Sequence, residues 1–495
     1  MPRMPTRREH CDAAIIGANR TGVQLALECA RAGLQTILVE CPGEAGGCIE
    51  DGGPPLPLLA SANIARLARS AGDFGVHTGN VEVDLGEVQR LRRQALVRGE
   101  SGPSVQALQH TPKLKVLRGK PRFEGAGLLS LRERQDEKGE SPLEIEAARF
   151  FINTGARDVL PNLPGLDSVP FLSARSALEV EELPAHLLVL GGSYLGVEFA
   201  QMFRRFGSRV SIVERHSQLL AREDRDVAAA VAQTLREDGV EVFLETEAID
   251  VTRQPGTEVR LRVRTSSGMH TLCASNLLVV HGRQPNTREL SLRAAGVRVD
   301  SRGYIEVNEY LETSAPQIYA LGVVNGGPPF AQVAQDDFRV IRANLLEGTP
   351  GAKAARTSPY TAFTDPPLGR IGLTQAQARA QGRKVRVAKL PMSKERAVTL
   401  AESRGLIKLL VDSSSDRIRG AAVLGTHSAE VIAMLQIAMM AGMPYTALRD
   451  GLSAHPALAA SLDSLFVALE ACEPFKKENA NEPAAVFSDR HQGIA

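Results

Sequence analysis

Residues 45–57 have the composition of a redox active-site segment, but they contain a single thiol. The segment reads Ala45-Gly-Gly-Cys-Ile-Glu-Asp-Gly-Gly-Pro-Pro-Leu-Pro57. Two cysteines can cycle between dithiol and disulfide, whereas Cys48 has no partner for that cycle within the segment. The chemistry available here therefore depends on the elements that precede and follow it.

The preceding residues have the order of a dinucleotide-binding unit. Residues 13–16 are apolar throughout, which is typical of a buried strand, and Gly17-Ala-Asn-Arg-Thr-Gly22 predicts a tight loop. Residues 23–32 have helical apolar spacing, and residues 36–40 predict a second strand that ends at Glu40. In such a unit the loop and helix N-terminus hold a pyrophosphate, and the acid accepts hydrogen bonds from a ribose.

One loop position departs from the Gly-x-Gly-x-x-Gly fingerprint. Asn19 stands at the second glycine, which normally lets the backbone approach the pyrophosphate. Asparagine tolerates left-handed backbone better than most residues. The turn can therefore survive, whereas the close approach is not assured.

The same unit recurs later in the chain, with Ser193 at the second-glycine position. The landmarks Gly17, Gly22, Gly33 and Glu40 return as Gly191, Gly196, Gly207 and Glu214, at a constant offset of 174 residues (191 − 17 and 214 − 40). Two dinucleotide sites imply two nucleotides, one of which passes electrons to the other.

The composition argues against several other classes of protein. A length of 495 residues suggests about three domains. The net charge of +1 offers no broad field for nucleic acid or an anionic membrane, and no apolar run is long enough to span a bilayer. Six cysteines without zinc spacing fit a reducing cytoplasm and predict no metal site. We therefore expect a cytoplasmic protein.

Several elements are expected outside the two units. Residues 58–71 predict a helix, residues 72–120 a polar connection with helical character, and residues 123–131 two strands of a small sheet. Alternation after residue 360 predicts an antiparallel sheet followed by helices. The charged runs at Arg204–Arg205 and Arg222–Asp226 are interpreted as solvated helix faces.

Taken together, these patterns resemble the class I pyridine nucleotide–disulfide oxidoreductases, which include dihydrolipoamide dehydrogenase, glutathione reductase and mercuric reductase. The resemblance covers residues 11–470, and residues 202–209 and 222–224 look closest to the mercuric-reductase-like branch. It rests on the two glycine units and on Ala45-Gly-Gly-Cys48, Asn153-Thr-Gly155, Tyr194-Leu-Gly-Val-Glu198, Gly282-Arg-Gln-Pro-Asn286, Phe363-Thr-Asp-Pro366 and His455-Pro456.

The resemblance implies an α/β fold with two Rossmann-like dinucleotide-binding domains and a C-terminal α+β dimerisation domain. The cofactors would be FAD and NAD(H) or NADP(H), and a homodimer would complete each active site with the partner's C-terminal segment. The implied boundaries are an FAD domain in residues 1–155 and 286–352, an NAD(P) domain in 156–285, a dimerisation domain in 353–470 and a disordered tail in 471–495.

The cofactor-binding positions follow from the matched motifs. Glu214 favours the 2′-hydroxyl of NAD, whereas Arg215 and Arg222 could meet a 2′-phosphate, so NADP stays open. The full set is Gly17, Asn19, Gly22, Glu40, Gly46, Gly47, Thr154, Gly155, Gly191, Ser193, Gly196, Glu214, Arg215, Gly282, Gly322 and Val323.

The catalytic positions carried over are Cys48, Tyr194, Glu198 and His455. Cys48 matches the first family cysteine, but Gly53 stands at the second, Leu56 at a serine and Pro57 at a lysine beside the flavin. Glu198 matches the glutamate that pairs with that lysine, so its usual partner is missing. Tyr194 matches a gate over the flavin, although a tyrosine there could simply pack. Cys41 is a poor substitute partner for Cys48, because it belongs beside the ribose site.

Two further positions depart from the family. His455-Pro456 is present, but Ala460 replaces the glutamate that orients the histidine. Val323 replaces an aspartate that bonds the flavin ribityl chain, a loss of roughly 1.5–3 kcal/mol of binding.

Two functions from different classes stay open. The first is a flavin-dependent NAD(P)H oxidoreductase that passes hydride through the flavin directly to a small acceptor such as a quinone, oxygen or another nicotinamide. A soluble transhydrogenase of the family likewise lacks the second cysteine. The second is a catalytically silent homodimer that keeps the loops because the fold needs the turns, which the losses at Asn19, Gly53 with Pro57, Val323 and Ala460 favour. Disulfide or mercuric-ion reduction is least favoured, because both need the missing thiol.

Overall fold

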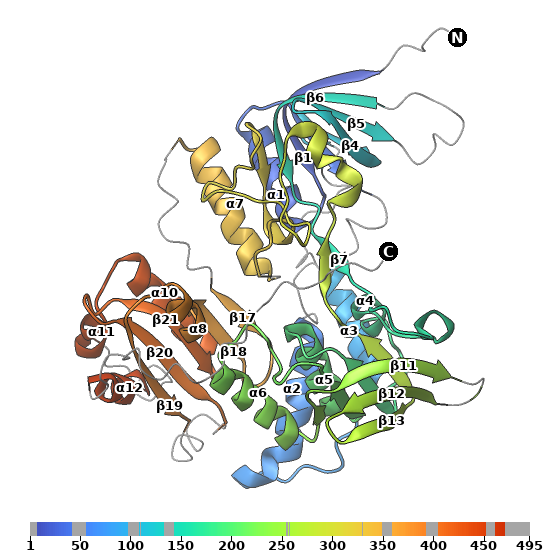
Figure 1. Ribbon diagram of the computed structural model, residues 1–495, viewed down its shortest axis with the longest axis vertical. Helices are drawn as coiled ribbons and strands as arrows, with labels where there is room; N and C mark the ends of the chain where they lie inside the picture. The colour runs from blue at the N-terminus through green and yellow to red at the C-terminus, as the bar shows by residue number, and fades with distance from the viewer. Residues whose placement is uncertain are drawn as a thin grey trace. The chain divides into compact units, whose positions relative to one another are not determined.

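The computed structural model describes residues 7–41, 56–97, 108, 110–132, 143–253, 256, 258–328, 330–348, 359–392, 404–451 and 461–470 (Figure 1). The chain divides into two compact units. The first runs from the N-terminus to Ala221 and from Val231 to Asp365, and the second comprises Arg222–Ala230 and the chain from Pro366 onward. Among the described residues, no helix is long and apolar enough to cross a membrane.

A largely parallel sheet forms the core of the N-terminal part of the first unit. Its strands are β1 (Arg8–Ile16), β2 (Thr36–Glu40), β3 (Leu114–Arg118), β6 (Leu143–Ile152) and β16 (Ile318–Ala320). They lie in the order β3-β2-β1-β6, and β16 pairs with the second half of β6. The strands therefore end together at one edge of the sheet, where a dinucleotide would bind.

The prediction that residues 123–131 form two strands of a small sheet is wrong. The antiparallel pair β4 (Lys120–Gly125) and β5 (Leu128–Arg132) continues the main sheet, because β5 pairs with the first half of β6. The connection before it is also more regular than expected. It contains η1 (Ala71–Phe74), α3 (Leu85–Val97) and β3, after the predicted helix α2 (Leu56–Ser70).

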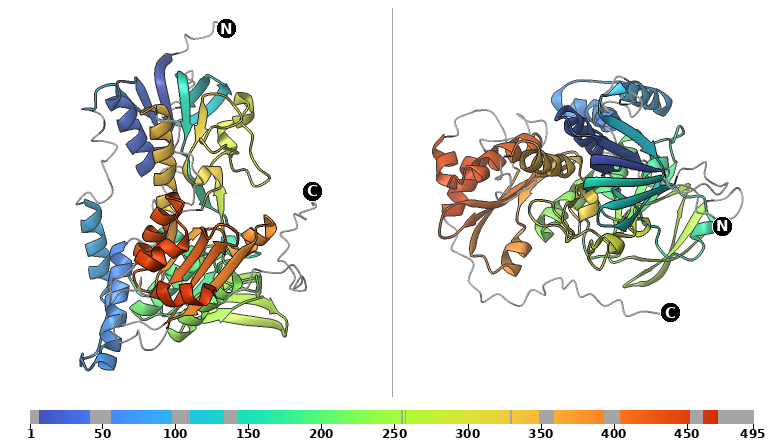
Figure 2. Two further views of the ribbon diagram at one scale, coloured as in Figure 1. Left: turned by 90° about the vertical axis from the view of Figure 1, so that its left-hand side faces the viewer. Right: turned by 90° about the horizontal axis from the view of Figure 1, so that it is seen from above.

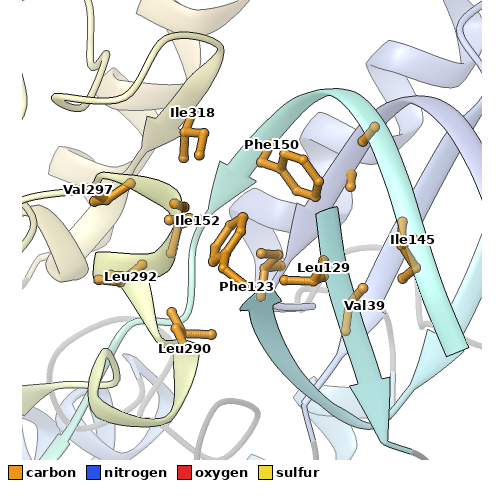
Figure 3. Close-up of a cluster of buried hydrophobic side chains, with 14 of the residues drawn as sticks. Val39, Phe123, Leu129, Ile145, Phe150, Ile152, Leu290, Leu292, Val297 and Ile318 are labelled. Carbon is orange, nitrogen blue, oxygen red and sulfur yellow. The ribbon is translucent and has the colours of Figure 1, made fainter. Parts of the chain in front are cut away.

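Both faces of this sheet are covered, which explains its continuous apolar strands. Helices α1 (Arg20–Arg31) and α7 (Ala331–Leu345) lie side by side on one face (Figures 1 and 2). On the other face, Phe123 and Phe150 meet edge to face at 5.2 Å between ring centroids. Leu290 and Leu292, from the short turns η5 (Arg288–Leu290) and η6 (Leu292–Ala295), complete that buried cluster (Figure 3).

The repeat predicted at an offset of 174 residues is present in the backbone. β8 (His186–Leu190), α5 (Tyr194–Phe206) and β9 (Arg209–Val213) repeat β1, α1 and β2, and both helices begin 174 residues apart, at Arg20 and Tyr194. With β10 (Glu241–Phe243) and β14 (Asn276–Val279), they form a parallel sheet in the order β10-β9-β8-β14. Helix α6 (Arg225–Glu237) connects β9 to β10 along the chain.

An antiparallel sheet between β10 and β14 has no counterpart among the sequence predictions. It consists of β11 (Glu247–Arg253), β12 (Val259–Thr265) and β13 (Gly268–Ala274). The remaining elements of the first unit are η4 (Leu166–Ser168), α4 (Ala174–Ala177), η7 (Gly322–Asn325), β17 (Tyr360–Ala362) and the paired strands β7 (Ala156–Asp158) and β15 (Arg283–Pro285).

The second unit contains the predicted antiparallel sheet. Strands β18 (Leu368–Gly372), β21 (Ile418–Leu424), β20 (Leu406–Asp412) and β19 (Val385–Pro391) are paired in that order. A core of buried apolar side chains joins this sheet to α10 (Ser428–Met440), α11 (Tyr445–Gly451) and α12 (Ser461–Glu470). Helix α8 (Gln375–Ala380) lies between β18 and β19 in the chain.

The charged runs are not the solvated faces that the sequence predicted. In the first unit, Arg205 is 4% exposed and bonds Asp238 and Asp365 at 2.9 and 2.5 Å. In the second unit, the ammonium of Lys408 lies 3.1 Å from Asp224 and 2.9 Å from Asp226. These charges are buried because each finds partners far away in sequence, which a local charge pattern does not reveal.

Candidate dinucleotide sites

The first glycine of each loop occupies a backbone conformation that side chains rarely adopt. Gly17 has φ +114° and Gly191 has φ +122°. A Cβ at Gly17 would lie 2.3 Å from the carbonyl oxygen of Asn153, and one at Gly191 would lie 2.5 Å from that of Val280. Both positions therefore require glycine, for the same reason in each unit.

The last glycine of each loop is required by close packing. A Cβ at Gly22 would lie 2.1 Å from the carbonyl oxygen of Gly17, and one at Gly196 would lie 2.0 Å from that of Gly191. Only a glycine lets the first turn of each helix pack this tightly on its loop. The two loops thus share one construction.

The position of the missing second glycine is the N-cap of the helix in both units. Asn19 and Ser193 have nearly the same extended backbone, with φ −73° and −70° and ψ 173°. Left-handed tolerance, the reason expected for Asn19, is therefore not needed. The Asn19 side chain accepts from the amide of Gly22 at 3.1 Å, and Ser193 accepts from Gly196 at 3.3 Å. Both substitutions thus stabilise the start of the helix.

The acids at the ends of the second strands, Glu40 and Glu214, have different partners. Glu40 pairs with the exposed Arg118, whose Nε and Nη2 lie 2.5 and 3.3 Å from the two carboxylate oxygens. Glu214 instead accepts from the Gly192 amide at 2.7 Å and from the His216 amide at 2.9 Å. The His216 ring Nδ1 also lies 2.5 Å from Glu214 Oε1. Glu214 is thus fixed to the second glycine loop through Gly192.

The residues around the first loop fit the adenosine and pyrophosphate portion of FAD better than its ribityl chain. The loop, the adjacent helix start and Glu40 are the groups that such a portion needs. Past β16, the Gly322 amide donates to Asp337 at 2.7 Å, which holds the following turn from α7. The next side chain, Val323, is apolar and half-buried, so it offers no hydrogen bond to a ribityl hydroxyl.

Three other predicted cofactor positions, Thr154, Gly155 and Gly282, lie in supporting loops. Thr154 is 2% exposed, and its hydroxyl donates to the carbonyl of Asn286 at 2.9 Å. The Asn286 amide returns a bond to the Thr154 carbonyl at 3.0 Å. Gly155 has φ +67° with open space around its missing side chain, and Gly282 is equally uncrowded.

Glu198 is a buried acid that pairs with no cation among the residues that the structure describes. It is 1% exposed, and Oε1 accepts from the Phe363 amide at 2.6 Å. Oε2 is buried and has no hydrogen-bond partner among the described residues. Burial raises the pKa of Glu198 to about 8, against a weaker opposing effect of the Phe363 bond, so the carboxyl is neutral at pH 7. Pro57, at the family's lysine position, is the second residue of α2 and cannot supply a charge.

Tyr194, the expected gate residue, lies within an aromatic cluster of the first unit. It begins α5 directly after the second loop and is 9% exposed. Its ring meets Phe330 and Tyr360 edge to face at 5.2 and 5.7 Å, and those two rings stack at 4.7 Å. The hydroxyls of Tyr194 and Tyr360 lie 3.1 Å apart. Sequence reasoning identified neither Phe330 nor Tyr360.

Four predicted site residues, Gly46, Gly47, Cys48 and His455, lie outside the described residues, as do Gly53 and Ala460. Cys41 is described. Burial raises the pKa of its thiol to about 12, and the nearby Glu40 adds to the effect. A thiol held protonated is a poor nucleophile, which disfavours Cys41 as a substitute redox partner.

Some residues of the candidate sites were missed by sequence reasoning. His216 stands two residues after Glu214, where a search for local hydrogen-bond donors could have found it. Arg118 pairs with Glu40 across 78 residues, because β2 and β3 are neighbours in the sheet. The sequence alone does not indicate an ion pair between residues so far apart along the chain.

Comparison with known proteins supports this arrangement. The family model for "pyridine nucleotide-disulphide oxidoreductase" matches residues 11–337, and its dimerisation-domain model matches residues 358–465. The chain is 35% identical over 460 residues to the probable pyridine nucleotide-disulfide oxidoreductase RclA of Escherichia coli K12, covering 92% of this chain and 98% of that protein. It is 32% identical to a dihydrolipoyl dehydrogenase of Thermus scotoductus, over 94% and 98% of the two chains.

Solved structures agree with the sequence relatives. The copper(II) complex of the HOCl-induced flavoprotein disulfide reductase RclA from E. coli superposes with a TM-score of 0.77 at 34% identity, covering 93% of this chain and 99% of that one. Members of the matched family are FAD-dependent and use NAD(P)H. With one family model covering most of the first unit and a second covering the C-terminal sheet, the chain belongs to the pyridine nucleotide-disulphide oxidoreductase family.

Proposed function

We propose that the chain is a flavin-dependent NAD(P)H oxidoreductase that passes hydride from NAD(P)H through FAD to a small acceptor, without a redox disulfide. The observation that carries this proposal is the shared construction of the two loops, each followed by an acid after the next strand. With a quinone or oxygen as acceptor, NAD(P)H, a proton and the oxidised acceptor give NAD(P)⁺ and the acceptor reduced by two electrons. With another oxidised nicotinamide, only the hydride is transferred and no proton is consumed. FAD, when bound, supplies two-electron exchange with the nicotinamide and one- or two-electron exchange with the acceptor.

The roles of the chain's own residues follow from their positions. The loops at Gly17 and Gly191 would bind the pyrophosphates, and Glu40 and Glu214 would meet the riboses. The cluster around Tyr194 would exclude water beside the second loop, since three aromatic rings pack there. These roles need no thiol.

The acceptors named in the titles of relatives are not carried over. Those relatives include a flavoprotein disulfide reductase and mercuric reductases. In this chain Gly53 and Pro57 stand where that chemistry would need a second thiol and a lysine. A quinone, oxygen or another nicotinamide needs neither group.

A silent homodimer is the second candidate, and two observations favour it. Arg118 engages both oxygens of Glu40, so a ribose would have to compete with a guanidinium. Val323 offers no hydrogen bond where the family's aspartate would bind the ribityl chain. Both features weaken the hold on FAD.

One measurement separates the two candidates. The purified protein is examined by visible absorption with and without added FAD, and then titrated anaerobically with NADH and NADPH. We expect a yellow protein whose flavin band is bleached by at least one of the two nucleotides. A protein that takes up no flavin contradicts the oxidoreductase proposal, whereas bleaching excludes the silent one. Turnover of a Cys48→Ser variant should equal that of the wild type. A large loss of turnover would show that the thiol takes part in the reaction.

A further inference from the structure

The carboxylate of Glu214 is held between the second loop and His216. Its side chain is 11% exposed. Oε2 accepts from Gly192, the second residue of the loop, and Oε1 accepts from the amide of His216 and contacts its ring. A Cβ at Gly192 would lie 3.0 Å from Oε2 and 2.5 Å from a methyl of Leu219, so this approach favours glycine at residue 192.

The equivalent acid of the first unit provides an internal comparison. Glu40 is neutralised by a guanidinium, and both partners are at least partly exposed. Glu214 is anchored instead by two backbone amides and an imidazole, on a side chain that is almost fully buried. The two units thus place an acid at the same position but fix its orientation and charge by different means.

We infer that His216 is a positioning residue that, with the Gly192 amide, orients the Glu214 carboxylate and makes the second site select NADH over NADPH. The inference rests on the proposed function, because it assigns the second loop to the nicotinamide nucleotide. A 2′-hydroxyl is a neutral donor that a fixed carboxylate can accept. A 2′-phosphate is mostly dianionic at neutral pH and would place its charge against that of Glu214.

The two arginines that the sequence offered to a 2′-phosphate do not reverse this preference. Arg215 and Arg222 are both exposed, so water screens their attraction for a phosphate. Glu214 is buried beside the loop, where like-charge repulsion is screened less. The carboxylate therefore dominates the discrimination.

The test is isothermal titration of the purified protein with NADH and with NADPH, carried out anaerobically after its flavin has been fully reduced with dithionite, so that binding is measured without hydride transfer. The wild type is expected to bind NADH at least roughly tenfold more tightly than NADPH, because like charges in contact are strongly disfavoured. His216→Ala removes the ring but keeps the backbone amide. It should weaken the binding of NADH several-fold and leave the binding of NADPH nearly unchanged. The ratio of the NADPH dissociation constant to the NADH dissociation constant should therefore fall. His216→Asn places an amide donor near the position of Nδ1 and should restore the ratio.

Two controls make the result specific. Glu214→Gln removes the charge and should bring the ratio of the two dissociation constants close to one. His270→Ala, at an exposed histidine on β13 of the same unit, should leave both constants unchanged. Equal or tighter binding of NADPH by the wild type, or a ratio unaffected by His216→Ala, overturns the inference and leaves the proposed function standing. Binding of neither nucleotide overturns both.

Discussion

The carboxyl of Glu198 shows how the loss of one residue changes the chemistry of another. The family resemblance implies a lysine partner at residue 57, where this chain has Pro57. The hydrogen bond from Phe363 lowers the pKa of the carboxyl less than burial raises it, so the acid keeps its proton at neutral pH. The site has therefore exchanged a buried ion pair for a buried neutral acid, which avoids an unpaired charge.

This neutral acid predicts a pH-dependent stability. The pKa of Glu198 is about 8 in the folded protein and close to its ordinary value when unfolded, so the folded state binds the extra proton between these limits. The free energy of unfolding should therefore fall as pH rises from about 4.5 to about 8, by an amount on the order of 2–5 kcal/mol. Glu198→Gln should remove this part of the pH dependence in urea unfolding measured between pH 5 and pH 9.

The matched control is Glu430→Gln, at an exposed glutamate of α10. It should leave the pH dependence of unfolding as in the wild type. If Glu198→Gln also leaves it unchanged, the carboxyl is ionised in the folded protein and a cation must lie beside it.

Among the elements, the segment that contains β17 is held to α5 by Arg205. The guanidinium bonds the side chain and the carbonyl of Asp365, and it also bonds Asp238 after α6. Asn63 of α2 contributes its side-chain oxygen at 2.7 Å. One arginine thus connects four parts of the first unit.

Removal of this arginine should destabilise the first unit strongly. Arg205→Ala removes the cation that Asp238 and Asp365 share, although Asp365 keeps its ion pair with Arg66 at 2.8 Å. We expect a loss of about 3–5 kcal/mol in the free energy of unfolding by urea. Arg209→Ala serves as the control, because Arg209 is 64% exposed and pairs at the surface with Glu241. Arg209→Ala should change the free energy of unfolding by no more than about 1 kcal/mol. If both variants lose a similar free energy of unfolding, the burial of Arg205 does not explain its contribution to stability.

The same contacts show which features the sequence could predict. The strand–loop–helix–strand units were predictable, because glycine spacing and apolar runs are local signals. Arg205 was not, since its partner Asp365 lies 160 residues away. β12 was missed despite an alternating pattern from Val259 to Thr265, so its signal was available. For Glu198, the motif predicted the missing partner, whereas the neutral charge state follows from the burial of the side chain in the folded chain.

At the scale of the whole molecule, the C-terminal unit presents apolar side chains to solvent in the single chain. Ile437 and Met440 are 69% and 74% exposed, and their spacing places them on one face of α10. Val467 of α12 is 65% exposed. Because this region matches a dimerisation domain, these side chains are expected to be covered in a homodimer.

We predict that Met440→Glu converts the dimer into a monomer, because it would bury a charge in an apolar interface. Light scattering coupled to size exclusion should give twice the 53.1 kDa chain mass for the wild type and about that mass once for the variant. Met269→Glu changes another methionine, 53% exposed on β13 of the first unit, and should leave the dimer intact. A dimeric Met440→Glu protein would place the interface elsewhere.

The capped loops have a consequence for how members of this family are found in genomes. A search that demands glycine at the middle position passes over both halves of this chain, since asparagine and serine stand there. In both halves that residue caps the helix with an extended backbone, so any short side chain with an oxygen acceptor satisfies the same geometry. A pattern that admits Asn, Ser, Thr or Asp there, between two obligatory glycines, would recover relatives that the strict fingerprint discards.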